Sequence, residues 1–315
     1  MKTALVVAAV AVAVVAVAAV AGTRGPGNAA EARAADAPWT FAAPMSQRRS
    51  YIAAAELDRK IYAAGGMVGE TGRFLSVFQR FDPAANDWVT LTPLPDPTRA
   101  AAGAALDGVV YVFGGQTDAG VTDRVLAYDI AKGEWEDRAP LPRPLFNEAA
   151  VAMDGKIYVL GGFSGGKELR SVYVYDPPSD SWSVSAPMPI PNHTFGAVDF
   201  QGGIWTFGGR RGEETLRDVF IFDPQAEKWR AGPTMPKPME LNGTAVWGPE
   251  IHTIWEHTYQ IYDARTGEWS QGPEPLVPRH GLKAFAIDGT LYAVGGCTTE
   301  LHDSQVVEAR NIAIR

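Results

Sequence analysis

The chain has 315 residues, of which 46% are hydrophobic and 20% charged, and its formal net charge is −8 at neutral pH. An acidic chain without a basic run argues against nucleic acid as a partner. Its single cysteine, Cys297, has no intrachain partner for a disulfide, so we expect stability to come from packing alone.

The N-terminal segment reads as a targeting sequence. Residues 4–21 form an uncharged run of mainly Ala and Val behind Lys2, which is typical of a secretory leader. The run is also about the minimum length of a membrane span, so residues 1–21 are interpreted as a signal peptide or an uncleaved anchor. Residues 22–37, rich in Gly, Ala and charge, are expected to be a flexible linker. Both interpretations predict export of residues 38–315. The exported part would be periplasmic or secreted if residues 1–21 are cleaved, and held at the membrane if they are not.

From residue 38 onward the sequence repeats itself. An aromatic residue and an aspartate are followed, six residues after the aspartate, by tryptophan. The five copies begin at Phe81, Tyr128, Tyr175, Phe222 and Tyr262, a spacing of 47, 47, 47 and 40 residues. A fixed period of this length is the signature of a repeat architecture, whose units stack because none buries enough surface alone.

Each unit contains the same further signals. A double glycine precedes the aromatic-aspartate pair in four copies and recurs near the C-terminus at Gly295-Gly296. Strand-like runs such as 109–113 and 156–160 lead into the glycines, and Asp-Gly pairs such as Asp107-Gly108 precede those runs. Asp-Gly pairs favour tight hairpins, so we expect four antiparallel strands per unit.

This pattern of Gly-Gly, Tyr/Phe-Asp and Trp resembles the kelch repeat over residues 39–315. The resemblance implies a β-propeller in which each unit is one blade. Units beginning near residues 46, 96, 143, 190, 237 and 279 predict six blades. The sixth unit has no tryptophan after its glycines, so we expect the strand around Trp39 to complete that blade and close the ring.

One end of the expected channel, which we call the mouth, collects polar residues. Strand direction places the residue before each inner strand and the loop after each Gly-Gly pair at this end. These mouth positions are Ser50, Arg99, Phe146, His193, Glu240 and His280. Their neighbours include Arg49, Asn147, Asn192, Asn242 and Arg279.

Arg, His, Glu and Asn concentrated in a concave mouth form the candidate ligand site. The alternative is that they are ordinary loop residues, with the arginines bonded to neighbouring carbonyls. The predicted ligand-binding set is Arg49, Ser50, Arg99, Asn147, His193, Glu240, Asn242, Arg279 and His280.

The fifth unit departs from the pattern. It has Ile254-Trp255-Glu256 where the others have Gly-Gly, and it is seven residues shorter. One interpretation is an open side of the mouth, with Glu240, Glu256 and His257 lining the entry; the other is that this one repeat has drifted. His193, His280, Glu240, Glu256, Cys297, His302 and Asp303 are possible metal ligands. None has a dedicated ligand spacing, so we expect no metal and no other cofactor.

Two functions remain open. The first is a binding module that recognises a protein, peptide or glycan at the mouth, since rigid blades hold variable loops. The alternative is an enzyme, a sugar mutarotase resembling the sialic acid (N-acetylneuraminate) epimerases built on exported six-bladed kelch propellers. Anomer exchange needs an acid, a base and a cation for the sugar carboxylate. Glu240 with His193 or His280 are the catalytic candidates, and Arg99 or Arg279 would hold the carboxylate.

Overall fold

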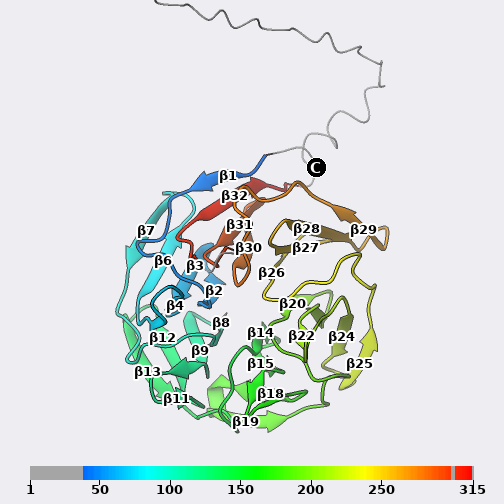
Figure 1. Ribbon diagram of the computed structural model, residues 1–315. Helices are drawn as coiled ribbons and strands as arrows, with labels where there is room; N and C mark the ends of the chain where they lie inside the picture. Colours follow the sequence, from blue (N-terminus) through cyan, green and yellow to red (C-terminus); the bar gives the residue numbers. More distant parts are fainter. Residues whose placement is uncertain (1–37, 299–301, 314–315) are drawn as a thin grey trace, which may run out of the picture.

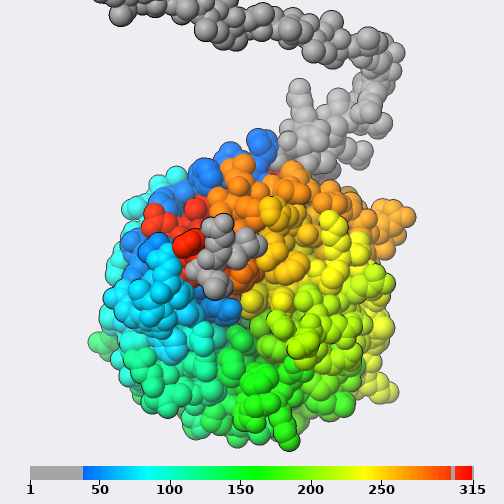
Figure 2. Space-filling model, viewed as in Figure 1, coloured from blue at the N-terminus to red at the C-terminus, as the bar shows by residue number. Residues whose placement is uncertain are grey.

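The computed structural model describes residues 38–298 and 302–313 and contains six four-stranded antiparallel sheets set around a common axis (Figure 1). This confirms the predicted six-bladed propeller. The leader and linker expected for residues 1–37 lie outside the described residues. Colours follow the chain around the disc, so that blue N-terminal residues lie beside red C-terminal ones (Figure 2).

Each blade runs from an inner strand at the axis to an outer strand at the rim. Blade one has β2 (Ala53–Leu57), β3 (Lys60–Ala64), β6 (Phe78–Asp82) and β7 (Asp87–Thr90). Blade two has β8 (Ala102–Leu106), β9 (Val109–Phe113), β12 (Val125–Asp129) and β13 (Glu134–Arg138). Blade three has β14 (Ala149–Met153), β15 (Lys156–Leu160), β18 (Val172–Asp176) and β19 (Ser181–Val184), with a 3-10 turn, η1 (Pro177–Ser179), between the last two.

The remaining blades follow the same order. Blade four has β20 (Gly196–Phe200), β21 (Gly203–Phe207), β24 (Val219–Asp223) and β25 (Lys228–Ala231). Blade five has β26 (Gly243–Trp247), β27 (Glu250–Trp255), β28 (Thr258–Asp263) and β29 (Glu268–Gln271). Blade six has β30 (Lys283–Ile287), β31 (Thr290–Val294), β32 (Val307–Asn311) and, at its edge, β1 (Thr40–Ala42). Nothing helical in residues 38–298 and 302–313 has the length and apolarity of a membrane span.

Four blades carry a small two-stranded ribbon directly after their glycine pair. The ribbons are β4–β5 (Met67–Val68, Arg73–Phe74), β10–β11 (Gln116–Thr117, Gly120–Val121), β16–β17 (Phe163–Ser164, Lys167–Glu168) and β22–β23 (Arg210–Arg211, Glu214–Thr215). In blade five, β27 instead passes into β28 through a tight turn at Glu256, whose φ is 49°. The shortened loop expected for this repeat is therefore present, and blade five has no ribbon among the described residues.

The ring closes through the N-terminal strand, as predicted. β1 pairs antiparallel with β32, with Thr40 opposite Ala309 and Ala42 opposite Val307. The Trp39 indole Nε1 donates to the carbonyl of Pro273, 2.9 Å away. The other blades repeat this bond to the connector of the preceding blade, for example Trp88 to Ala43 and Trp229 to Ala186. Trp39 is therefore the missing tryptophan of blade six.

Replacing Trp39 with phenylalanine should lower the free energy of unfolding by about 1 kcal/mol, the net worth of a typical hydrogen bond. A phenyl ring could still pack edge-on against Tyr259, whose centroid lies 5.6 Å from that of Trp39. The Pro273 carbonyl would lose its hydrogen-bond donor. Urea unfolding of the two proteins measures the difference. An unchanged midpoint would show that the indole N–H does not contribute to closure.

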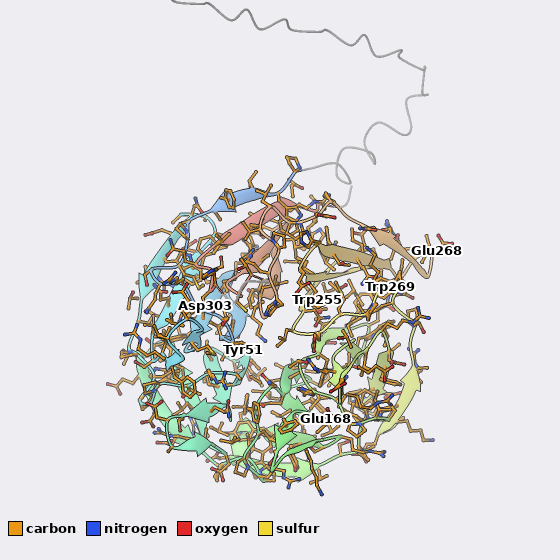
Figure 3. All side chains as sticks on the ribbon, in the orientation of Figure 1. Tyr51, Glu168, Trp255, Glu268, Trp269 and Asp303 are labelled. Atoms are coloured by element: carbon orange, nitrogen blue, oxygen red, sulfur yellow. The ribbon has the colours of Figure 1, made fainter. Side chains whose placement is uncertain are left out.

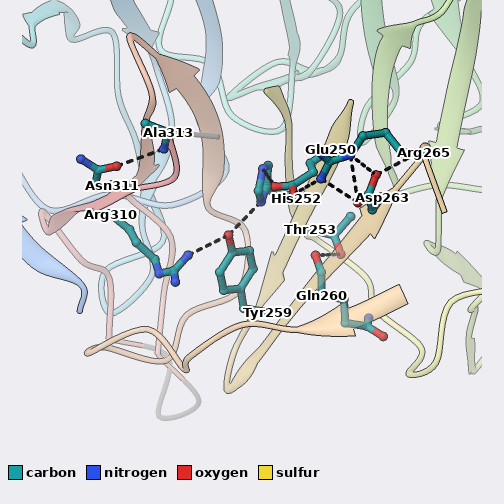
Figure 4. A network of polar contacts seen from close by, with 10 residues as sticks. All are labelled: Glu250, His252, Thr253, Tyr259, Gln260, Asp263, Arg265, Arg310, Asn311 and Ala313. Carbon is teal, nitrogen blue, oxygen red and sulfur yellow. Dashed lines mark hydrogen bonds and ion pairs between the residues drawn. The ribbon is translucent and has the colours of Figure 1, made fainter. Parts of the chain in front are cut away.

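A buried polar network joins blade five to blade six (Figure 4). The Tyr259 hydroxyl lies 2.8 Å from His252 Nδ1 and accepts from Arg310 Nη1 of β32 at 3.4 Å. The Arg310 guanidinium also lies 5.3 Å from the centre of the Tyr259 ring. Burial lowers the pKa of His252 to about 3, so the imidazole is neutral and Arg310 is the only cation among His252, Tyr259 and Arg310. It stabilises the joint next to the closing strand.

Small residues let the six inner strands approach one another. A side chain built at Gly103 of β8 would lie 2.6 Å from the backbone nitrogen of Ala54 of β2. The outer layers are filled by aromatic side chains, as where Phe78 meets Tyr128 of the next blade at 4.8 Å between centroids. The backbones of the inner strands thus pack closely around the axis, and large aromatic rings fill the space between the outer strands. The close approach of the inner strands keeps the central channel narrow.

Candidate functional site

A ring of left-handed residues surrounds the channel at the mouth. The residue after each mouth position has a positive φ, between 49° and 65°, in all six blades. In five of the six joints its N–H donates to the carbonyl of its counterpart in the preceding blade, at 2.6–3.0 Å. The ring residues are Tyr51, Ala100, Asn147, Thr194, Leu241 and Gly281. Tyr51 lies close to the axis (Figure 3). The ring holds the mouth positions rigidly around the axis.

The predicted mouth positions share one end of the molecule. Five of the six form an isolated β-bridge to the residue that follows the glycine pair of the same blade. The bridges are Ser50 to Met67, Arg99 to Gln116, Phe146 to Phe163, His193 to Arg210 and His280 to Cys297. The loop that carries each ribbon is thereby fixed beside its mouth residue.

Arg99 lies over aromatic rings of blade one. Its guanidinium carbon is 5.0 Å from the centre of the Phe74 ring and 5.9 Å from that of Tyr51. It donates to Gln116 Oε1 at 2.7 Å. The side chain is half-buried, so one face of the guanidinium packs while charge stays available at the mouth.

Blades three to five contribute a second group of contacts. The His193 ring packs against Phe163 at 5.7 Å, and its Nδ1 lies 3.7 Å from Glu168 Oε1. Burial lowers the pKa of His193, and the Glu168 carboxylate opposes this shift. Glu240 accepts from Arg210 Nη1 at 3.5 Å. His193 and Glu240 thus each contact the loop of the preceding blade.

His280 lies between a thiol and a carboxylate. Its Nε2 is 2.9 Å from Cys297 Sγ, and its Nδ1 is 3.4 Å from Glu256 Oε1. Cys297 is buried, and burial raises the pKa of its thiol to about 11. The thiol is therefore protonated at neutral pH and is a poor nucleophile.

Several predicted ligand residues are not accessible at the mouth, which corrects the sequence-based interpretation. Arg49 and Arg279 are fully buried inside their blades and donate to the carbonyls of Gly65 and Val77, and of Gly295 and Val306. This is the alternative role considered for the arginines. Two more members of the set, Ser50 and Asn242, are also buried. The members that remain partly exposed at the mouth are Arg99, Asn147, His193, Glu240 and His280.

The catalytic candidates for anomer exchange do not form one acid–base pair. His193 pairs with Glu168, His280 with Glu256, and Glu240 with Arg210. With Arg279 buried, one of the two arginines expected to hold a sugar carboxylate is lost. In residues 38–298 and 302–313 no three His, Cys, Asp or Glu side chains gather as a possible metal site.

Below the mouth lies a polar layer that the motifs did not reveal. Glu148, Asn242 and Lys283 line both a small cavity of about 40 Å³ under the ring and the larger cavity of about 360 Å³ in the channel. Glu148 is 7% exposed, and its Oε1 accepts from the Ala102 N–H at 3.2 Å. Burial raises its pKa to about 8, while the Lys283 ammonium opposes that shift. Burial also lowers the pKa of Lys283.

Replacing Glu148 with glutamine should stabilise the protein above pH 8 and have little effect near pH 4.5. The folded-state pKa of about 8 exceeds the ordinary value of 4.5, so the wild type loses stability as pH rises through this interval. Each pKa unit corresponds to about 1.4 kcal/mol, so a gain on the order of 3–5 kcal/mol is expected. Urea unfolding across this pH range measures it. Glu56→Gln at an exposed position is the control, and an equal difference at every pH would contradict the prediction.

Sequence comparison agrees with this architecture. A model described as the KLHDC2/KLHL20/DRC7 Kelch-repeats domain matches residues 51–245. The chain belongs to this kelch-repeat family. The match covers blades one to four, which carry the glycine-pair ribbons, and ends within β26, the inner strand of blade five.

Curated kelch proteins match shorter parts of the chain. Kelch-like protein 35 of Mus musculus is 36% identical over 92 residues, which cover 29% of this chain and 16% of that protein. Kelch-like protein 33 of Homo sapiens is 38% identical over 89 residues, covering 28% and 16%. Alpha-scruin of Limulus polyphemus is 26% identical over 98 residues, covering 29% and 11%. Because these matches span 11–16% of the relatives, they support the kelch repeat itself.

Proposed function

We propose that this kelch propeller is a binding module that holds a segment of a protein partner at its mouth. The observation that carries the proposal is the hydrogen-bonded ring at the axis, because each of its residues directly follows a mouth position and so fixes the place of the charged and aromatic side chains there. Rigid presentation reduces the conformational entropy lost on binding. The ribbons of blades one to four rise around this ring and add variable contacts.

The open side at blade five gives a partner segment its way in. There the tight turn replaces a ribbon, and Glu256 and the exposed His257 border the gap. Three carboxylates stand near the ring, those of Glu168, Glu240 and Glu256. A bound segment would therefore meet negative charge as well as the positive charge of Arg99. A segment that carries both basic and acidic side chains fits this surface better than a uniformly acidic one.

The test uses the full chain and a phage-displayed library of random peptides. Enriched peptides are titrated by calorimetry against the wild type, Arg210→Ala at the mouth and Arg59→Ala on the opposite face. Arg210 is 41% exposed and Arg59 77% exposed at the side chain. We expect Arg210→Ala to bind the peptides roughly tenfold more weakly, because one interface contact is lost. Arg59→Ala should bind them with the affinity of the wild type. The proposal would be overturned if no peptide were enriched, or if the protein bound a glycan array selectively instead. It would also be overturned if only Arg59→Ala lost affinity for the enriched peptides.

We also propose that the propeller is exported by residues 1–21, on the support of the uncharged Ala/Val run behind Lys2. An alkaline phosphatase reporter without its own leader, fused after residue 37, should be active in bacterial cells. Val14→Arg with Val15→Arg should abolish that activity. An active reporter with the doubly charged run would contradict export by this segment. Mass spectrometry of the product distinguishes cleavage from anchoring.

A further inference from the structure

Polar side chains interrupt the lining of the channel at one level. The first residue of the inner strand is Ala or Gly in five blades and Lys283 in the sixth. The residue before that strand is apolar in four blades, and is Glu148 in blade three and Asn242 in blade five. Thr244 stands on β26 just below. Four polar residues therefore occupy positions that this fold otherwise fills with small or apolar ones.

Several atoms of this layer are buried without a partner. Glu148 Oε2, Asn242 Oδ1 and Thr244 Oγ1 make no hydrogen bond within the described protein. Asn242 uses one N–H of its Nδ2 to donate to the Phe207 carbonyl at 3.3 Å, while its Oδ1 accepts no hydrogen bond. Buried polar atoms are satisfied in most native proteins. Three unused oxygens at one level indicate that a further molecule supplies hydrogen-bond donors here.

The larger cavity gives access to this layer from the face opposite the mouth. It measures about 360 Å³, and its lining runs from Glu148 and Lys283 to Glu56 and Asp199. Glu56 and Asp199 are exposed, so the cavity opens to solvent between them. At the mouth end the hydrogen-bonded ring leaves only about 40 Å³. A solute therefore enters through the acidic opening, which favours a group with positive charge.

The two ionisable side chains of the layer stand on opposite sides of the axis. Glu148 leads into blade three and Lys283 begins blade six, which are three blades apart in a ring of six. Both residues line the same two cavities, so they face a common space in the channel. A ligand with a single charge could pair with only one of these two side chains and would leave the other without a partner.

We propose that this layer binds a small zwitterion, a molecule with one ammonium and one carboxylate group. Its ammonium donates to Glu148 Oε2 and Asn242 Oδ1, and its carboxylate accepts from Lys283 Nζ. The ligand ammonium favours the ionised form of Glu148, which burial alone disfavours. The site is separate from the mouth surface, so it stands or falls independently of the partner-binding proposal.

The experiment is calorimetric titration of the full chain with ω-amino acids of increasing length: glycine, β-alanine and 4-aminobutyrate. Butylamine and butyrate, each carrying only one of the two charges, are titrated in parallel. We expect saturable binding of one length, at least tenfold tighter than either single-charge compound. Equal binding of the two classes, or no binding of any of the three, would overturn the proposal, and this comparison needs no variant.

Two variants then place the ligand. Glu148→Gln and Lys283→Met keep side-chain size while removing one charge each, and both should weaken binding at least tenfold. Glu134→Gln and Lys228→Met make the same changes at exposed positions of outer strands and should bind as the wild type does. Thermal unfolding confirms that each variant is folded. Unchanged affinity in both channel variants would show that the zwitterion binds elsewhere.

Discussion

Replacing Arg279 with alanine should lower the free energy of unfolding by about 3–5 kcal/mol, the range for breaking a buried ion pair. Arg279 and Glu308 are both 0% exposed, and Arg279 Nη2 lies 2.5 Å from Glu308 Oε2. The guanidinium also donates to the carbonyls of Gly295 and Val306 at 2.7 and 2.8 Å. Alanine would leave the Glu308 carboxylate buried without its cation. Urea unfolding at neutral pH measures the loss.

A double variant separates the charge from the packing. Arg279→Met combined with Glu308→Leu removes both charges and should be more stable than Arg279→Ala, because no buried ion remains unpaired. Arg59→Ala, which loses only the exposed contact to Asp288, should leave the unfolding midpoint unchanged. A loss for Arg279→Ala no greater than that for Arg59→Ala would refute the structural role assigned to this arginine.

Alanine at Gly161 should destabilise the propeller by roughly 2–5 kcal/mol, the sum of a left-handed backbone and an overpacked site. Gly161 has a φ of +61°, and an added Cβ would lie 2.5 Å from the Asn192 carbonyl oxygen and 2.8 Å from the Phe195 ring. That carbonyl already accepts the N–H of Gly162 at 2.9 Å. The backbones of two blades would have to separate, and the thermal unfolding midpoint should fall.

Gly165 in the same blade provides the matched control. Its φ is +55°, and no atom lies within 4 Å of an added Cβ. Gly165→Ala therefore carries the backbone penalty alone, about 1–2 kcal/mol. If the two alanine variants unfold at the same midpoint, close approach of the blades is not the reason for the first glycine of the pair.

Spacing in the sequence was sufficient to predict the blade count and the closing strand. The 47-residue period between Phe81 and Phe222, and the position of Trp39 before the first unit, depend only on order along the chain. The same reasoning placed the mouth positions at one end. Hydrogen bonds such as that from Trp39 to Pro273 link segments 234 positions apart, yet the repeat made their pairing predictable.

Side-chain direction was not accessible from spacing. Arg49 is one residue from a mouth position, but its side chain turns into the blade and donates to Gly65 and Val77. The polar layer does have a signal in the sequence, because Lys283 aligns with Ala or Gly in every other blade. An alignment of the six inner strands by position identifies that lysine, whereas the repeat motifs alone do not. Loop contacts such as His280 to Cys297 depend on geometry that no motif encodes.

Closure by β1 has a consequence for biosynthesis. Thr40 leaves the ribosome long before its partner Ala309, a delay of roughly ten to fifty seconds at 5–20 residues per second. During that interval the first strand has no sheet to join, and the last blade has an unprotected edge when it forms. That edge of β32 can also accept the corresponding strand of a second molecule when such a molecule is close by. Nascent chains held close together are therefore at risk of exchanging this strand, and spacing between them during synthesis favours the closed monomer.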